Sequence, residues 1–208
     1  LFRSSMASVS HCVVRTRARG RLTGFEIRVE GGVVQGEGEV AAAEGTVVEV
    51  NELFYNLPAR RKFLKSDAAE SAQVSRVVTQ MALAYPEIGI TLTAGIRTVA
   101  AWPPVDTLEA RIFQVYGERA DLLPVYRSVG GVTVSGYVAR LAEQGPRRGT
   151  QNVFVNRRAV KDKTIAHAVL DAYSQASIRE RSPEVHLFIE MPPDAVDVNV
   201  HPTKRSEE

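Results

Sequence analysis

A lysine near the end of the chain follows a strand-like segment and a proline. Residues 197–204 read DVNVHPTK, and the valines alternate with polar residues as in a strand with one buried face. Pro202 cannot donate to a sheet ladder, so the strand should end before it. Lys204 then stands on a loop held by that strand, which suits a cation that meets an anion such as a phosphate. The alternative is a solvated lysine after a β-strand.

A second set of cations follows Pro58, a residue that suits the first turn of a helix. Arg60, Arg61 and Lys62 would crowd the start of this helix, where the positive end of the helix dipole repels them. Such an unfavourable arrangement suggests an anionic partner. On the local sequence alone, a solvated basic face is the alternative.

Three segments together resemble one family. Residues 45–64 (GTVVEVNELFYNLPARRKFL) are similar to the GT-VEV-LFYN-PARRKFL signature of the MutL family of DNA mismatch-repair proteins. Residues 155–162 (VNRRAVKD) resemble the VNGR-V-D segment of that family, with Arg157 where the family usually has glycine. Residues 197–204 resemble its VDVNVHP-K segment. The segments occur in the family's order, so the resemblance covers nearly the whole chain.

The resemblance implies a fold, and it also shows what this chain lacks. MutL proteins are similar to the ATPases of the GHKL superfamily, yet this chain has no D-x-G-x-G motif and no GFRGEAL box. We therefore expect an internal part of an α+β protein. Residues 1–85 would form the C-terminal half of a GHKL-type ATPase α/β sandwich. Residues 86–208 would form a transducer domain with a ribosomal-protein-like fold.

Two residues match nucleotide-contacting positions of the family. Lys204 matches the lysine that reaches the γ-phosphate of ATP, which implies a catalytic and nucleotide-binding role, since a cation there stabilises charge on the phosphoryl oxygens. Thr46 matches a position whose hydroxyl helps to hold the adenine end; the alternative is an ordinary strand residue. Arg60, Arg61 and Lys62 could lie at the nucleotide lid or at a dimer interface. The whole protein would use ATP and Mg²⁺, whereas we expect this chain alone to hold neither and to hydrolyse no ATP.

A third basic set points to DNA. The resemblance implies a positively charged groove for double-stranded DNA in this region, and Lys163 matches a basic position implicated there. Binding would be mostly to phosphates, hence independent of sequence and sensitive to salt. No aromatic residue is interleaved with the set, so stacking on single-stranded bases is not favoured. A solvated basic face is again the alternative. The set comprises Arg157, Arg158, Lys161 and Lys163.

Composition sets broad limits. The 208 residues allow one large or two small domains, and a net charge of +2 does not by itself indicate nucleic acid. The single cysteine, Cys12, excludes an internal disulfide and suits a reducing compartment. No apolar run is long enough to cross a membrane. The four histidines show no ligand spacing, so we expect no metal site.

Three functions remain as alternatives. The first is part of a MutL-type protein, a homodimeric ATP-dependent DNA clamp in the bacterial cytoplasm, associated with the nucleoid, that couples mismatch recognition to strand removal. Its partners would be double-stranded DNA, a MutS-like mismatch-recognition protein and a helicase or endonuclease of repair, and no membrane. The second is a segment of another GHKL ATPase, such as a type II topoisomerase. The third is a DNA-binding module without nucleotide chemistry.

Several elements must position these residues. A helix should begin at the capping box Asp67-x-x-Glu70, end near Tyr85 before Pro86, and bury one apolar stripe. That stripe consists of Val74, Val77, Val78 and Met81. A second helix should open at Asp106, and a third should be capped by Asp162. The remaining pattern predicts strands at 9–15, 24–29, 45–50, 88–93, 97–102, 125–127, 132–140, 151–156, 159–160, 185–190 and 196–200. For the second domain, the resemblance implies a four- or five-stranded sheet with helices on one face.

Overall fold

The computed structural model describes residues 2–141, 149–174 and 183–196, with side chains from residue 5 onward. The predicted strand and lysine of residues 197–204, and with them Lys204, lie outside the described residues. The chain forms two compact units, residues 1–70 and 71–208. The domain boundary after residue 85 stays a prediction. Each unit is described by itself.

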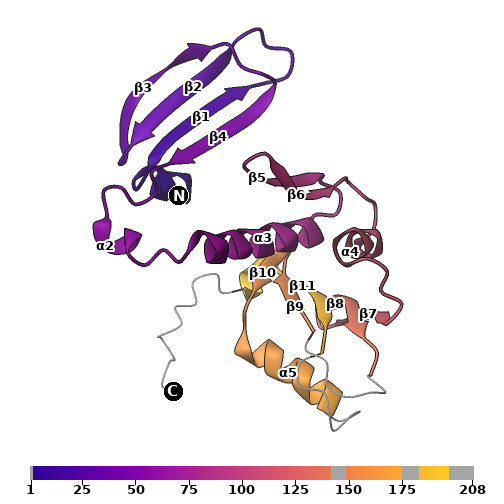
Figure 1. Ribbon diagram of the computed structural model, residues 1–208. Coiled ribbons are helices and arrows are strands. Elements are labelled where there is room, and N and C mark those ends of the chain that lie inside the picture. Colours follow the sequence, from indigo (N-terminus) through magenta and orange to yellow (C-terminus); the bar gives the residue numbers. More distant parts are fainter. Residues whose placement is uncertain (1, 142–148, 175–182, 197–208) are drawn as a thin grey trace. The chain divides into compact units, whose positions relative to one another are not determined.

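The first unit is a four-stranded antiparallel sheet that follows a short N-terminal helix, α1 (Phe2–Ala7) (Figure 1). Gly31 and Gly32 have φ of 56° and 90°, so a glycine turn joins β2 to β3. The strands predicted at 9–15, 24–29 and 45–50 are confirmed with small shifts of their ends. The strand order is β3 (Val33–Val40), β2 (Gly24–Glu30), β1 (His11–Arg17) and β4 (Gly45–Asn51).

The second unit contains a mixed five-stranded sheet and a separate hairpin of β5 (Ile90–Ala94) and β6 (Arg97–Trp102). Strand β11 pairs parallel with β9 and antiparallel with β8. Among the described residues of this unit, the α-helices are α3 (Asp67–Ala84), which begins in the first unit, α4 (Leu108–Tyr116) and α5 (Lys163–Ser174), and a short 3-10 helix, η1 (Pro193–Ala195), follows β11. The sheet order is β10 (Arg158–Val160), β9 (Gln151–Val155), β11 (Val185–Glu190), β8 (Val132–Ala139) and β7 (Leu122–Val129).

Helices cover both faces of the five-stranded sheet (Figure 1). On one face, Leu83 of α3 and Ile112 of α4 pack with the fully buried Phe154 of β9. On the other, Val169 and Tyr173 of α5 pack on Val185 of β11. The expectation of helices on a single face is therefore wrong. Successive side chains of a strand point to opposite faces of the sheet. Strands β9 and β11 carry apolar side chains on both faces, so helices can cover both.

The predicted burial of the apolar stripe of α3 is wrong for three of its four residues, since Val78 alone is half-buried. Val74, Val77 and Met81 are 49%, 45% and 52% exposed. The buried part of α3 is its last turn, Ala82, Leu83 and Ala84, which enters the core of the second unit. The helix ends at Ala84, as Pro86 predicted. A helical stripe shows that a face can be buried, but it does not show where along the helix a partner lies.

Two of the predicted caps differ from the structure and one agrees. Asp67 is the first helical residue of α3, and the Glu70 carboxylate accepts from the backbone N–H of Lys65 at 2.9 Å. Helix α4 is capped by the Thr107 hydroxyl, which accepts from the N–H of Ala110, and not by Asp106. Helix α5 is capped as predicted, since Asp162 Oδ1 accepts from the N–H of Ile165 at 2.9 Å.

Candidate functional site

Thr46 lies on β4 directly opposite Thr16 of β1. The two hydroxyl oxygens are 2.8 Å apart, and the Thr16 hydroxyl also donates to the Gly45 carbonyl at 3.3 Å. Both threonine side chains are exposed. The sheet register therefore holds the Thr46 hydroxyl in one place while leaving it accessible. Thr16 escaped the sequence analysis because only strand pairing brings it beside Thr46.

The cations after Pro58 lie at the end of a helix, not at its start. Helix α2 spans only Pro58–Arg61, with Pro58 in its first turn and Lys62 as its C-cap. Arg60 and Arg61 occupy the last turn, where the helix dipole favours positive charge. The expected dipole repulsion, and the anionic partner inferred from it, therefore have no basis in this helix.

The third basic set lies around the turn between β9 and β10. Val155 pairs with Arg158, so Asn156 and Arg157 are the two turn residues, with φ of 46° and 64°. Such turns favour Asn-Gly because both positions need positive φ. The Asn156 side chain binds Met191 at two points, donating to its carbonyl and accepting from its N–H, both at 3.0 Å. This clamp fixes the turn to the chain that follows β11.

Arg157 is already engaged within the protein. Its Nη1 donates to Glu87 Oε1 at 2.6 Å, and its guanidinium lies 5.5 Å from the centre of the Tyr85 ring. Glu87 follows the end of α3, 70 residues earlier in the chain. Its pKa is lowered by a backbone hydrogen bond and by the Arg157 guanidinium. The sequence carries no signal for this pair.

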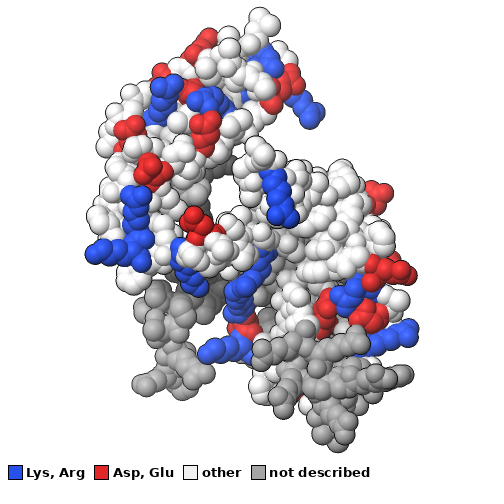
Figure 2. All heavy atoms as spheres, in the orientation of Figure 1, with Lys and Arg blue, Asp and Glu red and all other residues white. Residues whose placement is uncertain are grey.

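The other three basic residues of this set are exposed. Arg158 lies on β10, Lys161 follows it, and Lys163 opens α5. None of the three has a carboxylate within ion-pair distance among the residues that the structure describes. Figure 2 shows that basic and acidic side chains are interspersed on the visible face, so local pairing decides which cations are available to an anion.

Buried Arg111 of α4 fixes the segment that carries Glu87. Its Nη2 donates to the carbonyls of Pro86 and Ile88, at 2.6 and 2.7 Å, and its Nη1 donates to Gln114. Burial lowers the pKa of Arg111, and the Glu87 charge partly opposes that effect. Both carbonyls that flank Glu87 are therefore held by one side chain.

A buried polar network joins four elements of the second unit. Asn152 Nδ2 donates to Tyr116 Oη at 3.1 Å and to His186 Nδ1 at 3.0 Å, and His186 Nε2 lies 3.0 Å from Glu184 Oε1. Arg119 donates to both oxygens of Glu184. Burial raises the pKa of Tyr116, and the Asn152 amide partly opposes this. The spacing of the four histidines gave no metal site, and nothing in the sequence signals this role of His186.

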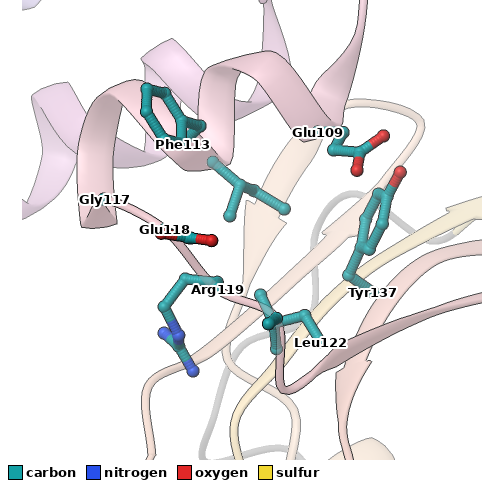
Figure 3. A pocket seen from close by; sticks show the side chains of 9 residues that line it. Glu109, Phe113, Gly117, Glu118, Arg119, Leu122 and Tyr137 are labelled. Carbon is teal, nitrogen blue, oxygen red and sulfur yellow. The ribbon is translucent and has the colours of Figure 1, made fainter.

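A cavity of about 250 Å³ lies between α4 and the start of β7 (Figure 3). Glu109 and Tyr137 point toward one another at one end, and Ile112, Phe113 and Leu122 supply apolar lining. Burial and the Glu109 carboxylate raise the pKa of Tyr137. Among the described residues, none of those predicted to bind nucleotide or DNA lines this cavity.

The described residues form neither a metal-binding cluster nor a membrane-spanning helix. Within 2–141, 149–174 and 183–196, no group of three or more histidine, cysteine, aspartate or glutamate side chains could hold a metal ion. In the same part of the chain, no helix has both the length and the apolar character needed to span a membrane.

Known proteins resemble this chain in sequence and in structure. The family model described as "DNA mismatch repair protein, C-terminal domain" matches residues 112–206. The DNA mismatch repair protein MutL of Geobacter sulfurreducens is 41% identical over 203 residues, which is 96% of this chain and 33% of that protein. MutL of Symbiobacterium thermophilum is 40% identical over 202 residues, 96% of this chain and 32% of that protein. The chain thus spans about one third of the curated relatives it matches.

Solved structures of MutL proteins also resemble this chain. The Aquifex aeolicus MutL ATPase domain complexed with ADP superposes with a TM-score of 0.72 and 31% identity, covering 92% of this chain and 72% of that one. The Myxococcus xanthus DNA gyrase B-subunit has a TM-score of 0.57 at 16% identity and covers 93% of this chain and 60% of that one, which shows a shared fold alone. The chain therefore belongs to the MutL family of DNA mismatch-repair proteins, within the GHKL superfamily.

Proposed function

We propose that this chain is the part of a MutL-type mismatch-repair protein that contacts duplex DNA, within an ATP-dependent clamp that couples mismatch recognition to strand removal. The observation that carries the DNA role is the exposure of Arg158, Lys161 and Lys163 without a carboxylate partner among the described residues. A cation that has no internal partner has no ion pair to break when it meets a phosphate.

The DNA would be held by its backbone. Lys163 opens α5, and its side chain is exposed, so its ammonium group can reach a phosphate at the protein surface. Phosphate contacts position a protein on DNA without reading its sequence. Three such contacts would give a slope of about −2.7 for log K against log salt, at ~0.9 per phosphate neutralised.

The proposed nucleotide role rests on Thr46 and Lys204. Among the described residues, Thr46 fits a nucleotide because its exposed hydroxyl makes one hydrogen bond, to Thr16, and can make another. The Aquifex relative carries ADP. In the whole protein ATP with Mg²⁺ would supply the phosphoryl group that is hydrolysed, and Lys204 would hold charge on its oxygens.

The remaining partners are proposed for the whole protein. A MutS-like mismatch-recognition protein would act before it, a helicase or endonuclease of repair after it, and a second copy would complete a homodimer. The mismatch-repair names of its relatives support this reading, and a bacterial cytoplasm with nucleoid association is the matching location.

The Lys163→Glu variant tests the DNA role. Its affinity for two duplexes of unrelated sequence is measured over a range of salt concentrations and compared with that of the original chain. We expect weaker binding to both duplexes and a salt slope reduced by about one, because one phosphate contact is lost. Arg127→Glu is the matched control. It makes the same charge change at an exposed position on β7, the opposite edge of the sheet from β10. Equal effects of the two variants would reject the site.

A further inference from the structure

One residue of the basic set differs from the other three, because Arg157 has an acidic partner inside the protein. Its Nη1 lies 2.6 Å from Glu87 Oε1, and the guanidinium also lies over the Tyr85 ring. Arg158, Lys161 and Lys163 have no such partner in the described part of the chain. When an anion approaches, Arg157 must therefore give up an ion pair before it can bind, whereas the other three cations need not.

Both sides of this ion pair are held in place. On the acidic side, Arg111 binds the carbonyls of Pro86 and Ile88, the two neighbours of Glu87. On the basic side, Asn156 is clamped to Met191 at two points. Because both backbones are fixed, the pair forms with little loss of backbone freedom and is part of the resting structure.

The turn does not require an arginine for its own geometry. Arg157 has φ of 64°, a conformation that costs a residue with a Cβ more than it costs glycine. The guanidinium, and not the backbone, must therefore account for the residue at this position. Its contacts in the structure are a carboxylate and an aromatic ring, both of which a guanidinium binds well.

The pair is nevertheless exchangeable. The Arg157 and Glu87 side chains are 50% and 52% exposed, and ion pairs at such sites are weak and screened by salt. A guanidinium binds phosphate with the same forked geometry as carboxylate. A DNA backbone also presents a row of phosphates and releases counterions when they are neutralised, which a single carboxylate cannot match.

We propose that Glu87 competes with DNA phosphates for Arg157, so that the acidic side chain withholds this arginine from DNA until a phosphate replaces it. The proposal rests on the proposed DNA role of this surface. It makes Glu87 a negative regulator of DNA affinity although Glu87 lies outside every basic segment of the sequence. It also links DNA binding to the segment between α3 and β5, because release of Glu87 frees a side chain on that segment.

The test is a double-mutant cycle on duplex-DNA affinity in the whole chain, with Glu87→Gln, Arg157→Gln and the double variant. Glu87→Gln should tighten binding by about two- to fivefold, the range that one exposed ion pair supports. In the Arg157→Gln background, Glu87→Gln should tighten DNA binding only slightly, because it then removes one negative charge and releases no arginine. Arg157→Gln should weaken binding more in the Glu87→Gln background than in the original chain.

Glu118→Gln is the matched control, because Glu118 is exposed in the same unit and has no cation partner among the described residues. Arg157→Gly is a second variant that removes the guanidinium and suits the positive φ, and it should give the same cycle. The competition is refuted when Glu87→Gln gains no more than Glu118→Gln, or when the two changes add independently. If Lys163→Glu weakens DNA binding but the Glu87 and Arg157 changes are additive, only the competition is refuted and the DNA role stands. A Lys163→Glu variant that binds as tightly as the original chain, or an original chain that binds no duplex, refutes both.

Discussion

The His186 ring is fully buried, with Nδ1 3.0 Å from Asn152 Nδ2 and Nε2 3.0 Å from Glu184 Oε1. An amide nitrogen can only donate and a carboxylate oxygen can only accept, so the ring proton lies on Nε2. Asn152 uses its second amide hydrogen for Tyr116, and Glu184 is also bound by Arg119. The network thus connects β9, β11, the end of α4 and the loop before β7.

Glu184→Gln should make the second unit less stable and less sensitive to acid. Burial opposes ionisation of Glu184, but hydrogen bonds from His186 and Arg119 prevail and lower its pKa. A lowered folded-state pKa adds stability above the unfolded pKa of a glutamate, about 4.3, and this stability is lost as the pH falls through the folded-state value. Urea unfolding at neutral pH should show a loss of about 1–3 kcal/mol.

The dependence of the free energy of unfolding on acidic pH distinguishes this network from general charge effects. The free energy of unfolding of the original chain should fall below about pH 4, and the Glu184→Gln variant should lack part of that fall. Glu118→Gln removes the same charge at an exposed site and should follow the original curve. If both variants lose the same part of the acid response, the network does not explain it.

Phe154→Ala should destabilise the second unit strongly. Phe154 is fully buried on β9 and stacks on Phe188 with ring centres 4.5 Å apart. Truncation of a buried phenylalanine leaves a cavity and costs about 3–5 kcal/mol. Phe113→Ala makes the same chemical change on α4 at a side chain that is 61% exposed, so its effect on chemical denaturation should be much smaller. Similar losses in the two variants would contradict the described core.

Gly136→Ala should also destabilise the sheet, because β8 and β11 leave no room for a side chain there. A Cβ built on Gly136 would lie 2.0 Å from the carbonyl oxygen of His186, and its φ is 132°. Forced overpacking costs about 1–3 kcal/mol, and the backbone conformation adds strain. Gly36→Ala on β3 meets nothing within 4 Å, so its thermal unfolding should stay close to that of the original chain.

The local elements could be predicted from the sequence because their signals are local. Gly31 and Gly32 mark a turn by their backbone freedom, and Asp162 marks the start of α5 by its cap. The Arg157–Glu87 pair could not be predicted, since it joins residues 70 positions apart through the fold. The α3 stripe failed for a related reason, because periodicity describes Met81 but not its partner.

The candidate site shows the same division. Arg157, Arg158, Lys161 and Lys163 are adjacent in sequence, so their common location needs no tertiary information. Glu87 makes Arg157 less available to an anion than the other three, and this difference depends on tertiary structure. Thr46 was assigned by resemblance, while its partner Thr16 became visible only through the register of β1 with β4.

Lys204→Ala should separate the two nucleotide roles in a MutL protein that carries this segment with its full ATPase domain. ADP lacks the γ-phosphate, so removing a cation that contacts this group should slow ATP hydrolysis and leave ADP affinity nearly unchanged. Single-turnover hydrolysis and ADP titration measure the two effects, with Arg205→Ala as the control because it removes a neighbouring cation. Equal losses of hydrolysis and of ADP affinity would assign Lys204 to general nucleotide binding, because a contact confined to the γ-phosphate cannot affect ADP.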